Sequence, residues 1–109
     1  MEKIVAYLKS ESIESNSSKA FSLYEKEGFG EKKDEKILYS IFEAMFLFEK
    51  KKLEIRNLKE KVLTEIELIK KFEKIDKRFK IKYIVFKDLR EKGFVVKSAL
   101  KFGNEFRVY

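Results

Sequence analysis

The side chains best suited to bind a polyanion are concentrated between residues 70 and 82. Ammonium and guanidinium groups are common protein ligands of phosphate, because their charge and N–H donors match its oxygens. Seven cations occur in this stretch against only Glu73 and Asp76: Lys70, Lys71, Lys74, Lys77, Arg78, Lys80 and Lys82. The pattern fits a phosphate-binding surface. It equally fits the solvated face of a highly charged helix, and both interpretations remain open.

The net positive charge of the chain comes from its second half. Residues 1–55 hold 10 basic and 11 acidic side chains, whereas residues 56–109 hold 16 basic and 8 acidic ones. The first half is therefore near neutral, and the net charge of +7 arises from the second. A one-sided basic surface is typical of proteins that bind polyanions, of which nucleic acid is the most common.

Missing residue types exclude several kinds of chemistry. The 109 residues include no Cys and no His. A disulfide, a reactive thiolate, a His-ligated metal and a Ser-His-Asp or Cys-His triad are therefore excluded within these residues. Charged residues make up 41% and aromatic residues 15%, which is too apolar for a disordered tail. The composition predicts a folded, Lys/Glu-rich domain of the kind common in hyperthermophiles.

The sequence shows no targeting or membrane signal. Its first 12 residues contain neither an apolar core nor a small-residue cleavage site, so they do not resemble a signal peptide. The longest mostly apolar run, Ile37 to Phe48, is far shorter than the ~20 residues that cross a bilayer. We therefore expect a soluble, cytoplasmic protein.

Local patterns divide the first third of the chain into short elements. Ser17 or Ser18 is the expected N-cap of a helix, and Gly28 is its expected C-terminal residue in the left-handed conformation. A strand, a loop, a helix and a turn are predicted over residues 3–8, 10–18, 20–27 and 28–36, respectively.

The middle of the chain predicts a buried helix followed by a strand and a second helix. Residues 40–51 are apolar on most sides, which is typical of a helix at the centre of a core. Residues 53–55 alternate as a strand that can pair with residues 61–63. Thr64 with Glu67 fits a capping box for the next helix, and we prefer it to the rival start at Asn57 with Glu60. The expected core residues of the buried helix are Phe42, Met45, Phe46 and Phe48.

Residues 77–92 carry an ambiguous signal, because Tyr83 to Phe86 alone would suit a strand. A helix is favoured by the stop signal Lys92-Gly93 and by one shared helical face: Phe79, Tyr83, Phe86 and Arg90. A strand over 94–97, a turn over 101–104 and a strand over 105–109 should follow. The sequence ends inside that last strand, which suggests the front of a longer protein or one partner of a complex.

Residues 83–109 closely resemble the entry into the catalytic domain of archaeal tRNA-splicing endonucleases. The matching residues stand at the spacing of that family: Tyr83, Val85, Phe86, Asp88, Leu89, Arg90, Gly93, Phe94, Val96, Lys97, Lys101, Phe102, Gly103, Phe106, Arg107 and Tyr109. Earlier in the chain, Phe29-Gly30, Glu43-Ala44 and residues 53–55 resemble the family's aromatic-Gly turn, Glu-Ala helix and following strand.

The resemblance implies an α/β (α+β) protein in two parts. A small N-terminal α/β domain would occupy residues 1–75, and a truncated catalytic nuclease domain would begin at residue 76 and run to 109. The family cuts introns from precursor tRNA at a bulge-helix-bulge, needs no metal or other cofactor, and leaves a 2′,3′-cyclic phosphate and a 5′-hydroxyl. Its members work as homo- or hetero-oligomers, so further endonuclease subunits are the expected partners.

The resemblance also assigns roles to individual residues. Tyr109 matches the catalytic Tyr, which would act as general base on the 2′-OH beside the scissile phosphate. A free phenol has a pKa near ~10, so it needs nearby cations to act at neutral pH. Arg107 is two residues earlier on the same strand face and could stabilise the phenolate or hold a phosphate. Lys97 and Lys101 are further candidate phosphate contacts, although plain solvation would explain them equally well.

One departure from the family limits this assignment. The general-acid His and the Lys that stabilises the phosphorane follow the Tyr in the family, and this sequence has no His at all. These 109 residues alone should therefore not cleave RNA. They could be a truncated catalytic subunit, a fragment of a non-catalytic structural subunit, or a piece completed by another chain. The competing interpretation from a different class is a stand-alone basic RNA-binding domain.

Overall fold

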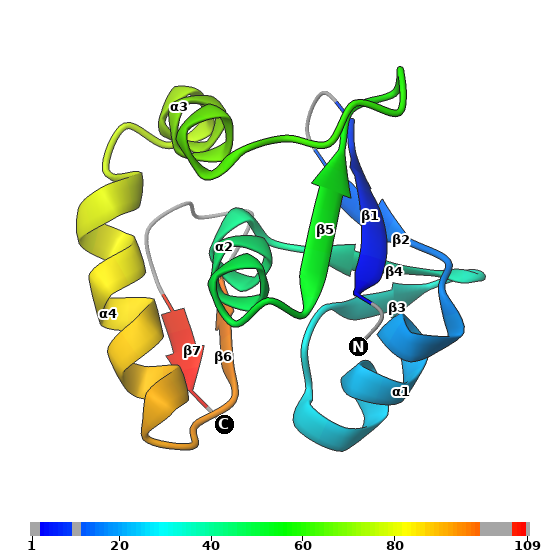
Figure 1. Cartoon of the computed structure of the whole chain (residues 1–109). Coiled ribbons are helices and arrows are strands. Elements are labelled where there is room, and N and C mark those ends of the chain that lie inside the picture. The colour runs from blue at the N-terminus through cyan, green and yellow to red at the C-terminus, as the bar shows by residue number, and fades with distance from the viewer. Residues whose placement is uncertain (1–2, 10–11, 99–105, 109) are drawn as a thin grey trace.

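The computed structural model describes residues 3–9, 12–98 and 106–108, with side chains described as far as residue 97 (Figure 1). The first half contains β1 (Ile4–Leu8), β2 (Ile13–Ser15), α1 (Ser18–Glu27), β3 (Glu31–Lys33), β4 (Lys36–Tyr39) and α2 (Ile41–Glu49). The second half contains β5 (Leu53–Arg56), α3 (Glu65–Ile75), α4 (Phe79–Glu91), β6 (Val96–Ser98) and β7 (Phe106–Val108). The mixed α/β fold class predicted from the sequence is thus confirmed.

Five strands form one mixed sheet in the order β3-β4-β2-β1-β5. β1 and the edge strand β5 are parallel, with Ile4 opposite Leu53 and Ala6 opposite Ile55, and the other neighbours are antiparallel. These four side chains are buried, because alternate residues of each strand face the same side of the sheet. β6 and β7 form a separate antiparallel pair.

Two predicted connections prove to contain strands. The predicted loop over 10–18 holds β2, in which Ile13 is only 1% exposed and the Ser15 hydroxyl donates a hydrogen bond to the Val5 carbonyl at 2.7 Å. The predicted turn over 28–36 holds β3, and β4 begins at its last residue. The loop and turn predictions were wrong because β2 is largely polar and β3 is exposed along its length, so pairing with neighbours defines them better than an apolar pattern.

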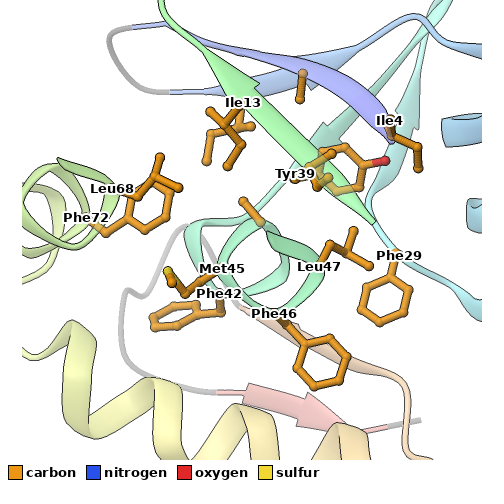
Figure 2. Close-up of a cluster of buried hydrophobic side chains, with 14 of the residues drawn as sticks. Ile4, Ile13, Phe29, Tyr39, Phe42, Met45, Phe46, Leu47, Leu68 and Phe72 are labelled. Carbon is orange, nitrogen blue, oxygen red and sulfur yellow. The ribbon is translucent and has the colours of Figure 1, made fainter. Parts of the chain in front are cut away.

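α2 lies at the centre of the core, as its apolar sequence predicts. Figure 2 shows Phe42 and Phe46 leaving this helix on the side of α4, while Leu47 lies on the side of the sheet. Leu68 and Phe72 reach the same core from α3. Of the four core residues expected in this helix, Phe42, Met45 and Phe46 are buried, and Phe48 packs against the core at partial exposure: the interpretation as core is confirmed.

The start of α3 follows the preferred capping box. The Thr64 hydroxyl accepts the Glu67 N–H at 3.2 Å, and the Glu67 carboxylate accepts the Thr64 N–H at 3.1 Å. The rival start at Asn57 is wrong, because its side-chain oxygen accepts N–H bonds from Lys59 and Lys61 and so closes a turn. That turn returns the chain to β5, where Leu63 N–H donates to Ile55 C=O at 2.8 Å.

α4 confirms the helical interpretation of residues 77–92; the helix ends at Glu91, one residue before the predicted end, and Lys92 is its C-cap. Its buried face binds α2 and α3 through aromatic rings. Phe79 stacks on Phe42 at 5.5 Å between centroids and lies 5.3 Å from Phe72, while Phe86 lies 6.0 Å from Phe42 and 6.1 Å from Phe46. The predicted turn over 101–104 lies outside the described residues. None of the helices in the described segments is long and apolar enough to cross a membrane.

Asp76 holds the corner between α3 and α4. Its carboxylate accepts the Arg78 N–H at 2.9 Å and the Lys82 ammonium at 2.6 Å. Burial alone would raise the pKa of this carboxyl. The hydrogen bonds and charges of Lys82 and Arg78 outweigh burial and hold the pKa below its usual value.

Replacing a buried ring of α4 should be far more costly than replacing an exposed side chain of the same helix. Phe86 is fully buried between α2 and α4, and Phe86→Ala should lower the free energy of unfolding by about 3–5 kcal/mol. Ile84 is 68% exposed, and Ile84→Ala should change the free energy of unfolding by less than about 0.5 kcal/mol. Urea unfolding of the two variants measures the difference; equal losses would contradict the packing described here.

Acid should weaken the α3–α4 corner through Asp76. A carboxyl whose pKa is lower in the folded protein than in the unfolded chain stabilises the fold at pH values above its unfolded pKa, near ~3.9. This contribution is lost as the pH falls through the pKa of the folded state. Wild type should therefore exceed Asp76→Asn in stability at neutral pH, and the gap should narrow as the pH approaches about 3. Urea unfolding of both proteins across this pH range tests the prediction. A stability difference that does not change with pH would contradict it.

Candidate functional site

The two-stranded sheet of β6 and β7 carries the segment in which the catalytic residues were predicted. Lys97 of β6 stands directly opposite Arg107 of β7 in the ladder, and Val96 stands opposite Val108. Figure 1 shows β6 and β7 side by side, with α4 along one side. Tyr109 and Lys101 lie outside the described residues, and Arg107 is described only in its backbone. Their proposed roles stay predictions.

Lys97 points into the protein and contacts the N-terminal part of the chain. Its ammonium group lies 3.0 Å from the Glu43 carboxylate and donates to the Gly30 carbonyl at 2.5 Å. The Lys97 side chain is only 17% exposed. Its donors are thus already engaged by two protein acceptors, and contact between Lys97 and RNA remains a prediction that this geometry does not favour.

Glu43 is the buried acceptor of that contact. One carboxylate oxygen accepts the Ser40 N–H at 3.1 Å and completes the capping box of α2, while the other accepts the Gly30 N–H at 2.8 Å and the Lys97 ammonium. The side chain is 4% exposed, and a carboxylate in such surroundings is stable only when it is paired and hydrogen-bonded. The sequence pattern identified Glu43-Ala44 as a matching motif but gave no sign of the pairing with Lys97.

Arg90 makes a second contact between α4 and the turn after α1. Its guanidinium donates to the Glu27 carbonyl at 2.8 Å and to the Gly28 carbonyl at 3.0 Å. The guanidinium carbon lies 3.7 Å from the centroid of the Phe29 ring. Burial is the main cause that lowers the pKa of Arg90, opposed by the charges of Glu43 and Glu27. These contacts give Arg90 a structural role, and Asp88 forms an ion pair with Lys92 at 3.0 Å.

Two tyrosines of the described segments are poor general bases. Tyr83 donates a hydrogen bond to the Glu49 carboxylate, and burial followed by this bond raises the pKa of its phenol. Burial, together with the charge of Glu43, also raises the pKa of Tyr39. Both phenols therefore hold their protons at neutral pH. Chemistry by a phenolate would need a different tyrosine.

The cations of residues 70–82 gather where α3 turns into α4. Six of them are exposed, and we call these six the basic corner: Lys70, Lys71, Lys74, Lys77, Arg78 and Lys80. Lys82 instead is partly buried against Asp76, and the Lys80 ammonium lies 3.7 Å from Glu73. Within the described segments, no group of three or more acidic side chains is placed to hold a metal ion. The surface can thus attract a polyanion, and its acidic groups are few.

Two domain profiles match the chain in succession. The profile of the tRNA intron endonuclease N-terminal domain matches residues 4–69, and that of the tRNA intron endonuclease catalytic C-terminal domain matches residues 79–109. The first runs from β1 into the first half of α3, and the second begins with α4 and contains β6 and β7.

Several archaeal proteins named tRNA-splicing endonuclease are similar to this chain. The one from Pyrococcus abyssi is 41% identical over 111 residues, covering 100% of this chain and 65% of the relative. The one from Pyrococcus horikoshii is 44% identical, covering 94% and 61%, and the one from Methanococcus vannielii is 37% identical, covering 80% and 54%. The chain thus spans less than two thirds of the length of these relatives. Because one family's two domain profiles match in order across most of its length, the chain belongs to the tRNA intron endonuclease family.

Proposed function

We propose that this chain is part of an endonuclease that cuts introns out of precursor tRNA. The observation that carries the proposal is the succession of the two domain profiles, over residues 4–69 and 79–109. The proposed domain boundary is near residue 76, in the short connection between α3 and α4. The proposed substrate is the bulge-helix-bulge of precursor tRNA, bound in concert with further endonuclease subunits.

The proposed chemistry centres on Tyr109, which directly follows β7 in the sequence. As general base, its phenolate would take the proton of the 2′-OH, and the 2′-oxygen would attack the adjacent phosphorus without a metal ion. The bond from phosphorus to the 5′-oxygen would break, and a general acid would give that oxygen a proton. The products would be a 2′,3′-cyclic phosphate and a 5′-hydroxyl. Cations near the phenol would lower its pKa toward neutrality, and Arg107 is the proposed source of one such charge. A His and a Lys supplied outside these 109 residues would complete the catalytic set.

The basic corner supports an RNA substrate. Its six exposed cations lie in α3, in the connection after it and in the first turn of α4, and phosphate contacts by such groups provide affinity that depends steeply on salt. The corner lies where the two profile matches adjoin: five of its cations fall between the matches, and Lys80 falls in the second. It could therefore hold RNA backbone while the strands of the catalytic part approach the cleavage point.

Cleavage in the absence of metal tests the proposed chemistry. We would join this chain to the C-terminal remainder of the Pyrococcus abyssi relative and incubate it with a bulge-helix-bulge RNA in EDTA. The joined protein should cut the RNA to a cyclic phosphate end, and Tyr109→Phe should slow cutting by about 10²–10⁴-fold. The 109-residue chain alone should be inactive. Binding without cutting by the joined protein would instead favour a structural subunit, and cutting only with added metal would contradict the mechanism.

Neutralising part of the basic corner should weaken RNA binding in a salt-dependent way. Lys70→Gln, Lys74→Gln and Lys77→Gln together should reduce the slope of log affinity against log salt by about 2–3, because each phosphate contact contributes about 0.7–0.9. The matched control changes the charge equally on distant elements, at Lys3, Lys26 and Lys33, which are also exposed. Titration of labelled RNA between about 50 and 200 mM salt measures the slope for both triple variants. Equal slopes for the two triple variants would rule out the basic corner as the RNA-binding surface.

A further inference from the structure

The turn Gly28–Gly30 of the N-terminal part receives contacts from three residues of the catalytic part, and we call it the docking turn. Arg90 donates to the Gly28 carbonyl and covers the Phe29 ring, Val95 packs beside Gly28, and Lys97 donates to the Gly30 carbonyl. All three contacting residues lie within the catalytic-domain match, and the turn lies within the N-terminal match. Besides the aromatic packing of α4, the two parts therefore meet at this short backbone segment.

The docking turn is shaped so that side chains can approach its backbone. Gly28 and Gly30 both have positive φ, at 70° and 86°, which favours glycine. A Cβ on Gly28 would lie 3.1 Å from a methyl group of Val95, and a Cβ on Gly30 would lie 2.3 Å from a methyl group of Ile37. Larger residues would thus separate the turn from its neighbours, and the absence of side chains keeps both carbonyls accessible.

Glu43 anchors the docking turn and binds the catalytic part at the same time. One of its oxygens accepts the Gly30 N–H, and the same oxygen lies 3.0 Å from the Lys97 ammonium. Removing Lys97 would leave this carboxylate buried with one charge uncompensated, which is strongly unfavourable. The pair is therefore satisfied only when β6 lies in the observed position against the turn.

Arg90 adds a contact of a different kind. Glu27 and Gly28 mark the C-terminal end of α1, where backbone carbonyls lack helical partners and a cation is favourable. The planar guanidinium reaches two of these carbonyls at once and lies over the Phe29 ring, which a lysine ammonium could not reproduce. Arg90 fixes the end of α4 and Lys97 fixes β6, so together they hold the segment from 90 to 97 at two points.

We propose that Arg90 and Lys97 are positioning residues that lock β6 and its partner β7 onto the docking turn through Glu43. In this role Lys97 serves the protein interface and makes no contact with RNA phosphate. The consequence for catalysis rests on the proposed function: β7 leads directly to Tyr109, so the lock would fix where that phenol stands relative to the N-terminal part. The lock itself is a property of the described residues and needs no RNA.

Hydrogen exchange on the 109-residue chain tests the lock directly. Lys97→Met should speed amide exchange in β6 and β7 by at least about 10-fold, while amides of β1 and β5 keep their protection within about 3-fold, as expected for local opening. Lys92→Met is the matched control, because it removes one charge from the same segment but breaks only an exposed ion pair. It should leave exchange in β6 and β7 unchanged. Equal exchange in the two variants would overturn the proposal.

Further variants keep the test decisive if Lys97→Met disturbs the whole fold. Arg90→Lys preserves the charge but loses the two-carbonyl contact, and it should speed exchange in β6 and β7 with β1 and β5 unaffected. Glu43→Gln combined with Lys97→Met should recover part of the protection lost in Lys97→Met, since no buried charge is left unpaired. Failure of both expectations would overturn the lock.

RNA binding separates the lock from the proposed function. If Lys97 touched a phosphate, Lys97→Met would lower the salt slope of RNA affinity by about one unit and leave exchange unchanged, which would overturn the proposal. An unchanged slope with faster exchange supports it. If the chain binds no RNA at all, the proposed function loses its support, while the exchange experiment still decides the lock.

Discussion

A buried carboxylate is the constraint on which the arrangement of this chain depends. Glu43 caps α2 through Ser40, holds the Gly30 N–H and pairs with Lys97, so one side chain links a central helix, a turn and a strand of the catalytic part. Desolvating a charge is costly, and each of these partners offsets part of that cost. The carboxylate therefore favours one arrangement of the three elements over compact alternatives in which any partner is missing.

Aromatic packing supplies the stabilisation that such a polar junction does not. Phe79 and Phe86 place α4 against Phe42 of α2 and Phe72 of α3, and this contact is large and apolar. Ring packing is tolerant of small shifts, whereas hydrogen bonds to Glu43 and to the docking turn are directional. The two kinds of contact have different roles. The rings hold α4 to the core, and the polar contacts define where the C-terminal end of α4 and β6 lie.

The sequence predicted the elements whose signals are local. Capping at Ser17 and Thr64, the left-handed Gly28 and the apolar α2 were all readable, because each depends on residues a few positions apart. β2 and β3 were missed because a largely polar strand and an exposed edge strand show little apolar alternation, and their strand character comes from pairing with other strands and not from a local pattern. The same reason hid the role of Lys97: its partner Glu43 is 54 positions away.

The distribution of cations separates two uses of positive charge in one small protein. Lys97 and Arg90 stand among carbonyls and a buried carboxylate, where their charge is neutralised or shared and little of it reaches solvent. The basic corner is exposed, with few acidic neighbours, so its field extends outward within the screening length of the solvent. A count of lysines treats the two groups alike. Burial distinguishes them: the partly buried cations are engaged by protein acceptors, and the exposed ones remain available to attract a polyanion.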